Sequence, residues 1–416
     1  MSPPPGALLF RAPLYSHVLT PSLRPRVCDH CLSRPSLWDH LPPAPALTRC
    51  ARCKLPYYCG ERCQRAAWKS GGHKAECKFL ARVLPRVPPP LVLLLLRTLA
   101  REARDPSGEE VPGGGRRRLE DLVTHREEVQ ATEQRREAFS AFLPVFKACV
   151  AELYGREQLF LAYCRLIVNG TELTDAMGNS VGTALSLGLS ALDHSCSPNC
   201  NVVFLGGGVE VRALPGLEVG WQEARINYVS TVLPREERRK ILSSQYYFQC
   251  QCDLCSRENG HDLTAGAALC TSCKAAVSVS SENCGCGAPV AAEARIAGAF
   301  LGRTGLEAWR ALSRTFHVLD WRMVEVGEGA MAEALEAGQF GVFLEVGARL
   351  MEAYRQHLHP YSLALGLHLA KLAKAAILLE RREARDLLQE ATDIFTLGLG
   401  LENPLVSYCH ALRQTL

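Results

Sequence analysis

The residues best suited to chemistry lie in one short segment that is rich in cysteine. Soft ligands occur there in pairs separated by two or three residues, so that one turn can present two side chains to the same metal. The pattern comprises Cys28, Cys31, Cys50, Cys53, Cys59, Cys63, His73 and Cys77. Because so short a stretch cannot build an apolar core, we expect two closed tetrahedral zinc sites. Disulfides are the alternative, but a reduced intracellular chain of this length favours metal.

Composition places the chain among globular proteins. Its 416 residues are 47% hydrophobic, which suffices for two or three domains with a sizeable core. A net charge of +4 is too small to indicate nucleic-acid binding by electrostatics alone. Residues 1–5 lack the features of a signal peptide, and the longest apolar run, residues 91–96, is too short to cross a bilayer. We therefore expect a cytoplasmic and nuclear protein with no membrane association, whose cysteines are thiols or metal ligands.

A helical stretch and then a loop are expected after the cysteine-rich segment. Residues 91–96 would be the buried part of the helix. Residues 105–118 contain proline, three consecutive glycines and three consecutive arginines, which predicts a flexible surface loop. The three arginines could form a targeting or nucleic-acid patch, although basic residues beside glycines are usually only solvated.

The predicted secondary structure changes twice more along the chain. From Leu159 onward we expect short β-like pieces, with a hairpin from residues 202–205 and 209–213 and a strand over residues 226–229. From residue 291 to the end the periodicity is helical and favours antiparallel helix pairs like those of tetratricopeptide repeats. The expected buried faces of two of these helices are Phe343, Val346, Leu350 and Tyr354, and Ala384, Leu387, Leu388, Ala391 and Phe395.

A second group of motifs lies between the cysteine-rich segment and the helical half. Residues 193–200 read DHSCSPNC, Tyr228 follows a predicted strand, and residues 250–255 read CQCDLC. Together these motifs resemble a SET domain with its post-SET zinc site, and the eight ligands before them resemble a MYND zinc finger. With a helical carboxyl half, the chain resembles the SMYD family of protein-lysine methyltransferases from about Leu8 to its end.

The resemblance implies an α+β fold in which a β-rich SET core is split by the finger and a helical insert, followed by an all-α, tetratricopeptide-like domain. The implied domains are residues 1–27 as a first SET portion without the family's Gly-x-Gly part, 28–77 as the finger, 78–154 as the insert, 155–249 as the SET core, 250–290 as the post-SET zinc region and 291–416 as the helical domain.

The resemblance also assigns the metal ligands. It places Cys28, Cys31, Cys59 and Cys63 on one zinc ion, Cys50, Cys53, His73 and Cys77 on a second, and Cys196, Cys250, Cys252 and Cys255 on a third. Spacing alone suggests a fourth tetrahedral zinc at Cys270, Cys273, Cys284 and Cys286. Free thiols on a surface loop are the alternative for this last group.

The remaining implied sites concern the cofactor and the lysine. By the resemblance, S-adenosylmethionine contacts Asn169, Asp193, His194 and Phe248, whereas Thr171 and Tyr246 line the lysine channel. Tyr228 is the implied catalytic residue. A desolvating aromatic channel and a nearby sulfonium both lower the pKa of the lysine amine, so no strong base is needed. Tyr228 would therefore align the reacting groups.

Three features depart from the family's pattern. The Gly-x-Gly loop does not precede residues 6–10, Asp193 stands where the motif has Asn, and residues 220–223 read GWQE where the family has Gly-Glu-Glu. The additional residue must be absorbed in a turn for Tyr228 to keep its direction.

Two main hypotheses follow. The first is a methyltransferase acting on histones or other proteins that carry a target lysine, expected to be a monomer. The second is a catalytically impaired adaptor that binds proline-containing peptides through the finger and partners through the helical half. A DNA-binding zinc protein is a weaker third, because the overall charge is mild.

Overall fold

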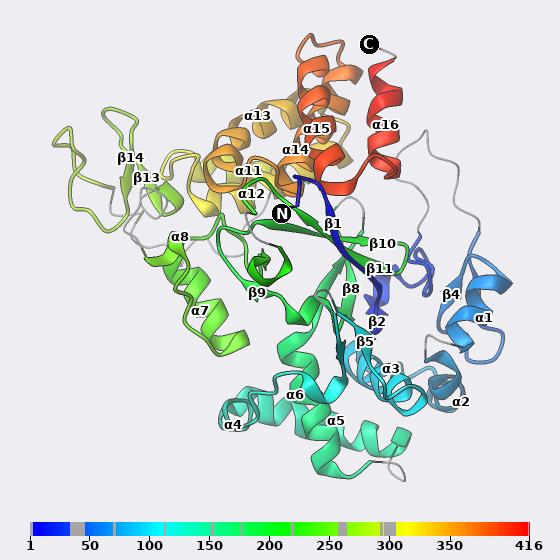
Figure 1. The fold of residues 1–416 in the computed structure, drawn as a ribbon. Coiled ribbons are helices and arrows are strands. Elements are labelled where there is room, and N and C mark those ends of the chain that lie inside the picture. The colour runs from blue at the N-terminus through cyan, green and yellow to red at the C-terminus, as the bar shows by residue number, and fades with distance from the viewer. Residues whose placement is uncertain are drawn as a thin grey trace.

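The protein has an α+β architecture, in which small central sheets are surrounded by helices and zinc-finger-like segments. The computed structural model describes residues 3–33, 46–69, 72–111, 114–150, 154–175, 178–217, 220–256, 264–291, 294, 305–414 and 416. In Figure 1 the cysteine-rich segment, in blue, lies on one side of the sheets, and the carboxyl-terminal helices, in orange and red, lie above them. Among the helices described, none is long and apolar enough to span a membrane.

Two three-stranded antiparallel sheets form the centre. The first has the order β1 (Leu8–Pro13), β11 (Gly208–Ala213), β10 (Cys200–Leu205). The second has the order β2 (Ser16–Leu19), β8 (Ser180–Leu185), β7 (Thr171–Thr174). Leu205 pairs with Gly208 across the tight turn between β10 and β11, which confirms the predicted hairpin.

The cysteine-rich segment and the insert share one apolar core with β2. The elements are β3 (Thr48–Arg49), β4 (Tyr57–Tyr58), α1 (Glu61–Lys69), α2 (His73–Val83), α3 (Pro90–Arg104), α4 (Arg126–Ala131), α5 (Glu133–Val150) and α6 (Arg156–Asn169). Residues 92–96 of α3 are buried, which confirms the expected buried helix. Since α3 packs on both α2 and β2, it connects the finger to the central sheet.

Three local predictions need correction. Residues 105–118 include a short hairpin, β5 (Glu109–Glu110) with β6 (Arg116–Arg117), stabilised by hydrogen bonds from the Arg116 guanidinium to the carbonyls of Ser107 and Gly108. Short β-like pieces were expected from Leu159 onward, but residues 156–169 form the helix α6. Their apolar residues recur at helical spacing.

The predicted strand over residues 226–229 is shorter than expected. Only β12 (Arg225–Ile226) pairs, in parallel, with β9 (Asp193–His194). The amide groups of Tyr228 and Val229 are bonded by side chains, since Tyr228 N–H donates to His194 Nδ1 and Val229 N–H donates to Asn227 Oδ1. These bonds replace the ladder and turn the chain.

The carboxyl-terminal half is helical, and each described helix packs on the next. The helices are α11 (Leu306–Leu312), α12 (Trp321–Glu336), α13 (Phe340–His357), α14 (Leu363–Leu378), α15 (Ala384–Leu399) and α16 (Pro404–Arg413). The predicted faces of α13 and α15 are buried, with Leu387 partly so, which confirms the helical periodicity. Before them lie α7 (Arg235–Tyr246), α8 (Asp253–Ser256) and the hairpin of β13 (Ala267–Leu269) and β14 (Ala276–Ser278). The domain boundaries themselves stay predictions.

The contact between β2 and β8 generates a test of the central sheet. Gly182 pairs with Leu19, and a Cβ at Gly182 would lie 2.0 Å from the carbonyl oxygen of Val18. We expect Gly182→Ala to lower the free energy of unfolding by about 1–3 kcal/mol, because the strands must move apart. Gly341→Ala is the control. A Cβ at this exposed helical position would have no described atom within 4 Å, so the substitution should be neutral or slightly stabilising. Equal urea midpoints for the two variants would contradict the assigned register.

Candidate functional site

The cysteine-rich segment contains two separate groups of possible metal ligands. The ligand atoms of Cys28, Cys31, Cys59 and Cys63 lie within 4.8 Å of one another, and so do those of Cys50, Cys53, His73 and Cys77. Turns after β2 and β3 supply the first two cysteines of each group. Helices α1 and α2 supply Cys63 and the pair His73 and Cys77, which lie one turn apart on α2. The structure therefore brings together the interleaved sets that the family resemblance implies.

The distances within both groups suit a tetrahedral zinc ion. Zinc–sulfur bonds of about 2.3 Å place two ligand sulfurs about 3.8 Å apart. The Sγ atoms of Cys31 and Cys59 are 3.5 Å apart, and those of Cys50 and Cys77 are 3.8 Å apart. All these cysteines are free, so the disulfide alternative does not hold for them. The donor sets, four sulfurs in one group and three sulfurs with an imidazole in the other, fit structural zinc.

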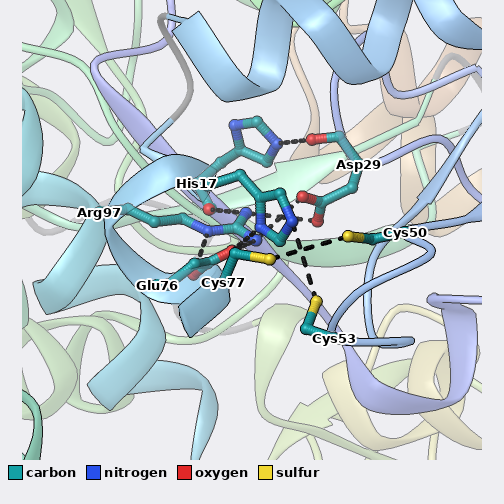
Figure 2. A network of polar contacts seen from close by, with 8 residues as sticks. His17, Asp29, Cys50, Cys53, Glu76, Cys77 and Arg97 are labelled. Atoms are coloured by element: carbon teal, nitrogen blue, oxygen red, sulfur yellow. Dashed lines mark hydrogen bonds and ion pairs between the residues drawn. The ribbon is translucent and has the colours of Figure 1, made fainter. Parts of the chain in front are cut away.

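A buried arginine lies behind the second group (Figure 2). Arg97 on α3 donates through Nε and Nη2 to the two carboxylate oxygens of Glu76, at 2.9 and 2.7 Å. The other oxygen contact of Glu76 is with His73 Nδ1, at 2.9 Å. This carboxylate bond leaves Nε2 of His73 as the metal-binding nitrogen, and Nε2 lies 3.8 Å from Cys53 Sγ.

Arg97 also contacts the first group and the central sheet. Its Nη2 lies 2.9 Å from Oδ2 of Asp29, the residue after Cys28. Its Nη1 donates to the carbonyl oxygen of His17 in β2, at 2.9 Å. His17 in turn places its Nε2 2.9 Å from the Asp29 carbonyl oxygen. One guanidinium therefore connects a neighbour of each metal group with a strand of the sheet.

The charges in this network stabilise one another. Burial alone would raise the pKa of Glu76, but the charge of Arg97 and the bond from His73 outweigh it and lower the pKa to about 2. Burial opposes charge on Arg97 as well, yet Asp29 and Glu76 raise its pKa well above its ordinary value. All three side chains are almost fully buried, so the ion pairs are shielded from water.

Sequence reasoning missed Arg97, although a signal was present. It is the single charged residue within a run of apolar residues on α3 that is otherwise suited to the core. A charge at such a position is expected only where it is paired.

A third group of cysteines lies beside β9. The Sγ atoms of Cys196, Cys250, Cys252 and Cys255 lie within 4.8 Å of one another, and those of Cys196 and Cys255 are 3.5 Å apart. The Arg238 guanidinium, which is buried, donates to Cys255 Sγ at 3.6 Å. Four sulfurs and a neighbouring positive charge suit a third tetrahedral zinc.

His194 connects this third group to Tyr228. Its Nδ1 accepts the backbone N–H of Tyr228 at 3.1 Å, and its Nε2 lies 3.2 Å from Cys196 Sγ. An accepting Nδ1 places the proton on Nε2, which can then donate to the sulfur. Burial lowers the pKa of His194 to about 4, so the imidazole is neutral near pH 7. The sulfur group therefore sets the position of the backbone that carries Tyr228.

Aromatic rings gather around this imidazole. Ring centroids lie 5.2 Å apart for His194 and Tyr228, 6.1 Å for His194 and Phe248, and 4.8 Å for Tyr228 and Tyr246. The Tyr228 hydroxyl donates to the Leu192 carbonyl oxygen, and burial raises its pKa. Tyr228, Tyr246 and Phe248 are all only partly buried, so the cluster adjoins the surface.

The segment that carries the additional residue lies in a turn before Tyr228. Residues Trp221–Glu223 form a short 3-10 turn ahead of β12, and Trp221 packs on Phe10 with ring centroids 6.3 Å apart. The Tyr228 ring packs against those of His194 and Tyr246.

Three other predicted residues lie apart from these ring contacts. Asn169 ends α6, and its amide nitrogen donates to the carbonyls of Val123 and Arg165. Thr171 begins β7, and Asp193 is exposed in β9, where its charge helps to raise the pKa of Tyr228. Their roles toward a cofactor or lysine stay predictions.

Arg117 is a residue that sequence reasoning assigned to a solvated loop. It lies in β6, and its positive charge lowers the pKa of Tyr228 against the larger effect of burial. Among the residues that the structure describes, its buried Nε has no hydrogen-bond partner. An unpaired buried donor near the ring cluster is the kind of group that an anionic part of a ligand would satisfy.

Removal of the guanidinium at position 97 tests the connection between the finger and the sheet. We expect Arg97→Met to lower the free energy of unfolding by about 3–5 kcal/mol, because two carboxylates would stay buried without a counter-charge. Arg104→Met on the same helix is the control, because this exposed residue should cost only about 0.5 kcal/mol. Urea unfolding of both variants at saturating zinc measures the difference, and equal losses would contradict the role assigned to Arg97.

Known proteins resemble the chain in the same regions. The sequence model of the MYND finger matches residues 28–77. Histone-lysine N-methyltransferase SMYD3 of Homo sapiens is 32% identical over 270 residues, which cover 63% of this chain and 59% of that protein. N-lysine methyltransferase SMYD2 of Bos taurus is 25% identical over 427 residues, or 97% of this chain and 91% of that protein.

Histone-lysine N-methyltransferase SMYD1 of Homo sapiens is a third relative, 29% identical over 275 residues, which cover 62% of this chain and 53% of that protein. The chain thus spans little more than half the length of SMYD3 and SMYD1, and almost all of SMYD2. The interleaved ligand groups, the cysteine group beside the aromatic cluster and these similarities agree, and the chain is similar over most of its length to the SMYD proteins, with a MYND finger at residues 28–77.

Proposed function

We propose that the chain is an S-adenosylmethionine-dependent protein-lysine methyltransferase that acts on histones or other proteins in the nucleus and cytoplasm. The observation that carries the proposal is the cluster of His194, Tyr228, Tyr246 and Phe248 beside a four-sulfur group. Zinc ions at this group and at the two finger groups would hold the scaffold. The names of the relatives as lysine methyltransferases support the same reaction.

The residues at the cluster suit the cofactor and a lysine. The partly exposed ring of Phe248 offers a face for an adenine, and the rings of Tyr228 and Tyr246 offer faces for positively charged groups. Asn169, Asp193 and His194 would add polar contacts, and Thr171 would line the channel with Tyr246. When bound, S-adenosylmethionine supplies an electrophilic methyl group.

The protein's own part is to position and desolvate the amine. Tyr228 is fixed at two points, because its backbone N–H is held by His194 and its hydroxyl by the Leu192 carbonyl. The neighbouring rings exclude water, which favours the neutral amine. Since burial raises the pKa of the Tyr228 hydroxyl, this group stays protonated near pH 7 and orients the amine instead of removing its proton.

A cavity between the sheet and the helical half provides room for the substrate chain. It has a volume of about 730 Å³ and is lined by Thr174 of β7, Phe204 of β10, and Tyr354 and His368 of the helices, among others. Because Thr171 and Thr174 both lie on β7, one strand runs from the proposed lysine channel to this cavity. We infer that residues flanking the target lysine bind here.

Removing the Tyr228 hydroxyl tests the reaction. We expect Tyr228→Phe to lower methyl incorporation about 100-fold, because the amine is no longer held in line, while cofactor affinity changes little. Tyr247→Phe is the matched control, since the hydroxyl of this neighbouring tyrosine has no hydrogen-bond partner in the described part of the chain. Radiolabelled methyl transfer to histones and to a protein mixture gives the rates, and calorimetry gives the affinity. Unchanged incorporation in Tyr228→Phe would refute the assigned role.

The guanidinium of Arg117, which is partly exposed, is expected to bind the anionic part of the cofactor. Loss of one hydrogen bond to a charged group costs about 1.5–3 kcal/mol, so Arg117→Gln should weaken cofactor binding about 10-fold or more. Arg116→Gln is the control, because the Arg116 guanidinium is exposed and bonded to Ser107 and Gly108. Equal dissociation constants for both variants in calorimetry would exclude this contact.

An adaptor function is the second candidate, and one surface feature favours it. A groove of about 540 Å³ beside the finger is lined by Leu55, Tyr57 and prolines that include Pro21 and Pro25. Aromatic and proline-lined grooves suit proline-containing peptides. The two functions separate in the Tyr228→Phe variant, which should lose methyl incorporation and still bind such peptides.

A further inference from the structure

A fourth group of cysteines lies at the hairpin of β13 and β14. This hairpin projects from the start of the helical half, on the side opposite α1 and β4 of the finger (Figure 1). The Sγ atoms of Cys270, Cys273, Cys284 and Cys286 lie within 4.8 Å of one another.

The geometry of this group excludes disulfides and fits a tetrahedral metal. The Sγ atoms of Cys270 and Cys286 are 3.6 Å apart, and those of Cys273 and Cys284 are 3.5 Å apart. A disulfide would require about 2.05 Å, whereas two sulfurs on one tetrahedral zinc lie about 3.8 Å apart. All four cysteines are free.

The turn at Cys270 repeats the turns that carry the finger ligands. Lys274 N–H donates to the Cys270 carbonyl at 3.0 Å, with the Lys274 backbone at a φ of 63°. In the finger, Lys54 N–H donates to the Cys50 carbonyl at 3.0 Å, with a φ of 58°. A left-handed backbone is costly for a lysine, and at both sites it directs two sulfurs to one point.

The other finger group uses the same turn. Leu32 N–H donates to the Cys28 carbonyl at 3.0 Å, and Leu32 has a φ of 60°. The second turn of the fourth group is tighter, with Gly287 N–H bonded to the Cys284 carbonyl at 2.8 Å and Gly287 at a φ of 87°. The fourth group is thus built with the same backbone turn as the metal-binding finger.

Few buried side chains stabilise the tip of the hairpin. Between residues 270 and 290 only Cys270 and Cys284 are buried, and residues 271–275 and 285–287 are exposed. Strands β13 and β14 have three residues each, and a two-stranded hairpin of that size is marginal in water. A cross-link is needed to keep four sulfurs together there.

The base of the hairpin, in contrast, is attached to the helical half. Leu269 N–H donates to the Thr315 carbonyl at 2.9 Å, and His317 N–H donates to the Ala267 carbonyl at 3.0 Å. Ala268 and Phe316 face each other across this bridge, and both are 1% exposed in the helical core. A metal at the tip would therefore order a hairpin whose base is already fixed.

We propose that Cys270, Cys273, Cys284 and Cys286 bind a further zinc ion with a structural role. Four sulfur ligands complete a tetrahedral shell and leave no position for water or substrate, so this ion stabilises the hairpin and takes no part in methyl transfer.

Metal content of the full-length chain gives the first test. The double variant Cys273→Ser, Cys286→Ser replaces the two exposed ligands and should contain about one zinc ion fewer per chain than the unmodified protein. The control Thr271→Ala, Ser272→Ala alters neighbouring exposed residues and should contain as much zinc as the unmodified protein. Equal zinc in all three proteins, measured by plasma mass spectrometry, would overturn the proposal.

Alkylation of the unmodified protein gives a second test that requires no variant. Exposed free thiols react rapidly, whereas zinc-bound thiolates are protected. We expect iodoacetamide to label Cys273 and Cys286 slowly, and at least 10-fold faster after zinc is removed with a chelator. Peptide mass mapping reads each site separately. Rapid labelling before chelation, or a disulfide between any of the four cysteines, would overturn the proposal. Neither readout depends on methyl transfer, so failure here is distinguishable from failure of the proposed activity.

Discussion

The buried guanidinium of Arg97 is the interaction on which the arrangement of the finger depends. It pairs with Asp29 beside one metal group and with Glu76, which holds His73 of the other, and it bonds to β2 of the central sheet. A buried charge is tolerated only with full compensation, and each partner here supplies part of it. The finger and the sheet consequently share one electrostatic network, and neither metal group is an independent module.

At the proposed methyl-transfer site, hydrogen bonds likewise connect a cysteine group to residues outside it. Cys196 and His194 are bonded side chain to side chain, and His194 holds the backbone of Tyr228. A zinc ion at this cysteine group would fix the sulfur, and through it the aromatic cluster. Metal binding at this group would therefore orient the residues that carry out the proposed reaction, in addition to holding the local loops together.

The sequence predicted best where the determining contacts are local. Ligand spacing, the β10–β11 turn and the helical faces of α13 and α15 are all set by residues close in the chain. Arg97 escaped prediction because its partners are 21, 68 and 80 residues away. The predicted strand over residues 226–229 was too long, because the side chains of His194 and Asn227 accept hydrogen bonds from the backbone amides after β12. The β propensity of a segment does not include such side-chain hydrogen bonds.

Hydrogen exchange of the intact chain, with zinc and after its removal by a chelator, tests the shared network most directly. We predict that amides of β2 and α3 lose protection together with those of residues 28–77, because loss of metal from His73 releases Glu76 and leaves Arg97 without fixed partners. Loss of protection confined to residues 28–77, with β2 and α3 unchanged, would contradict the account.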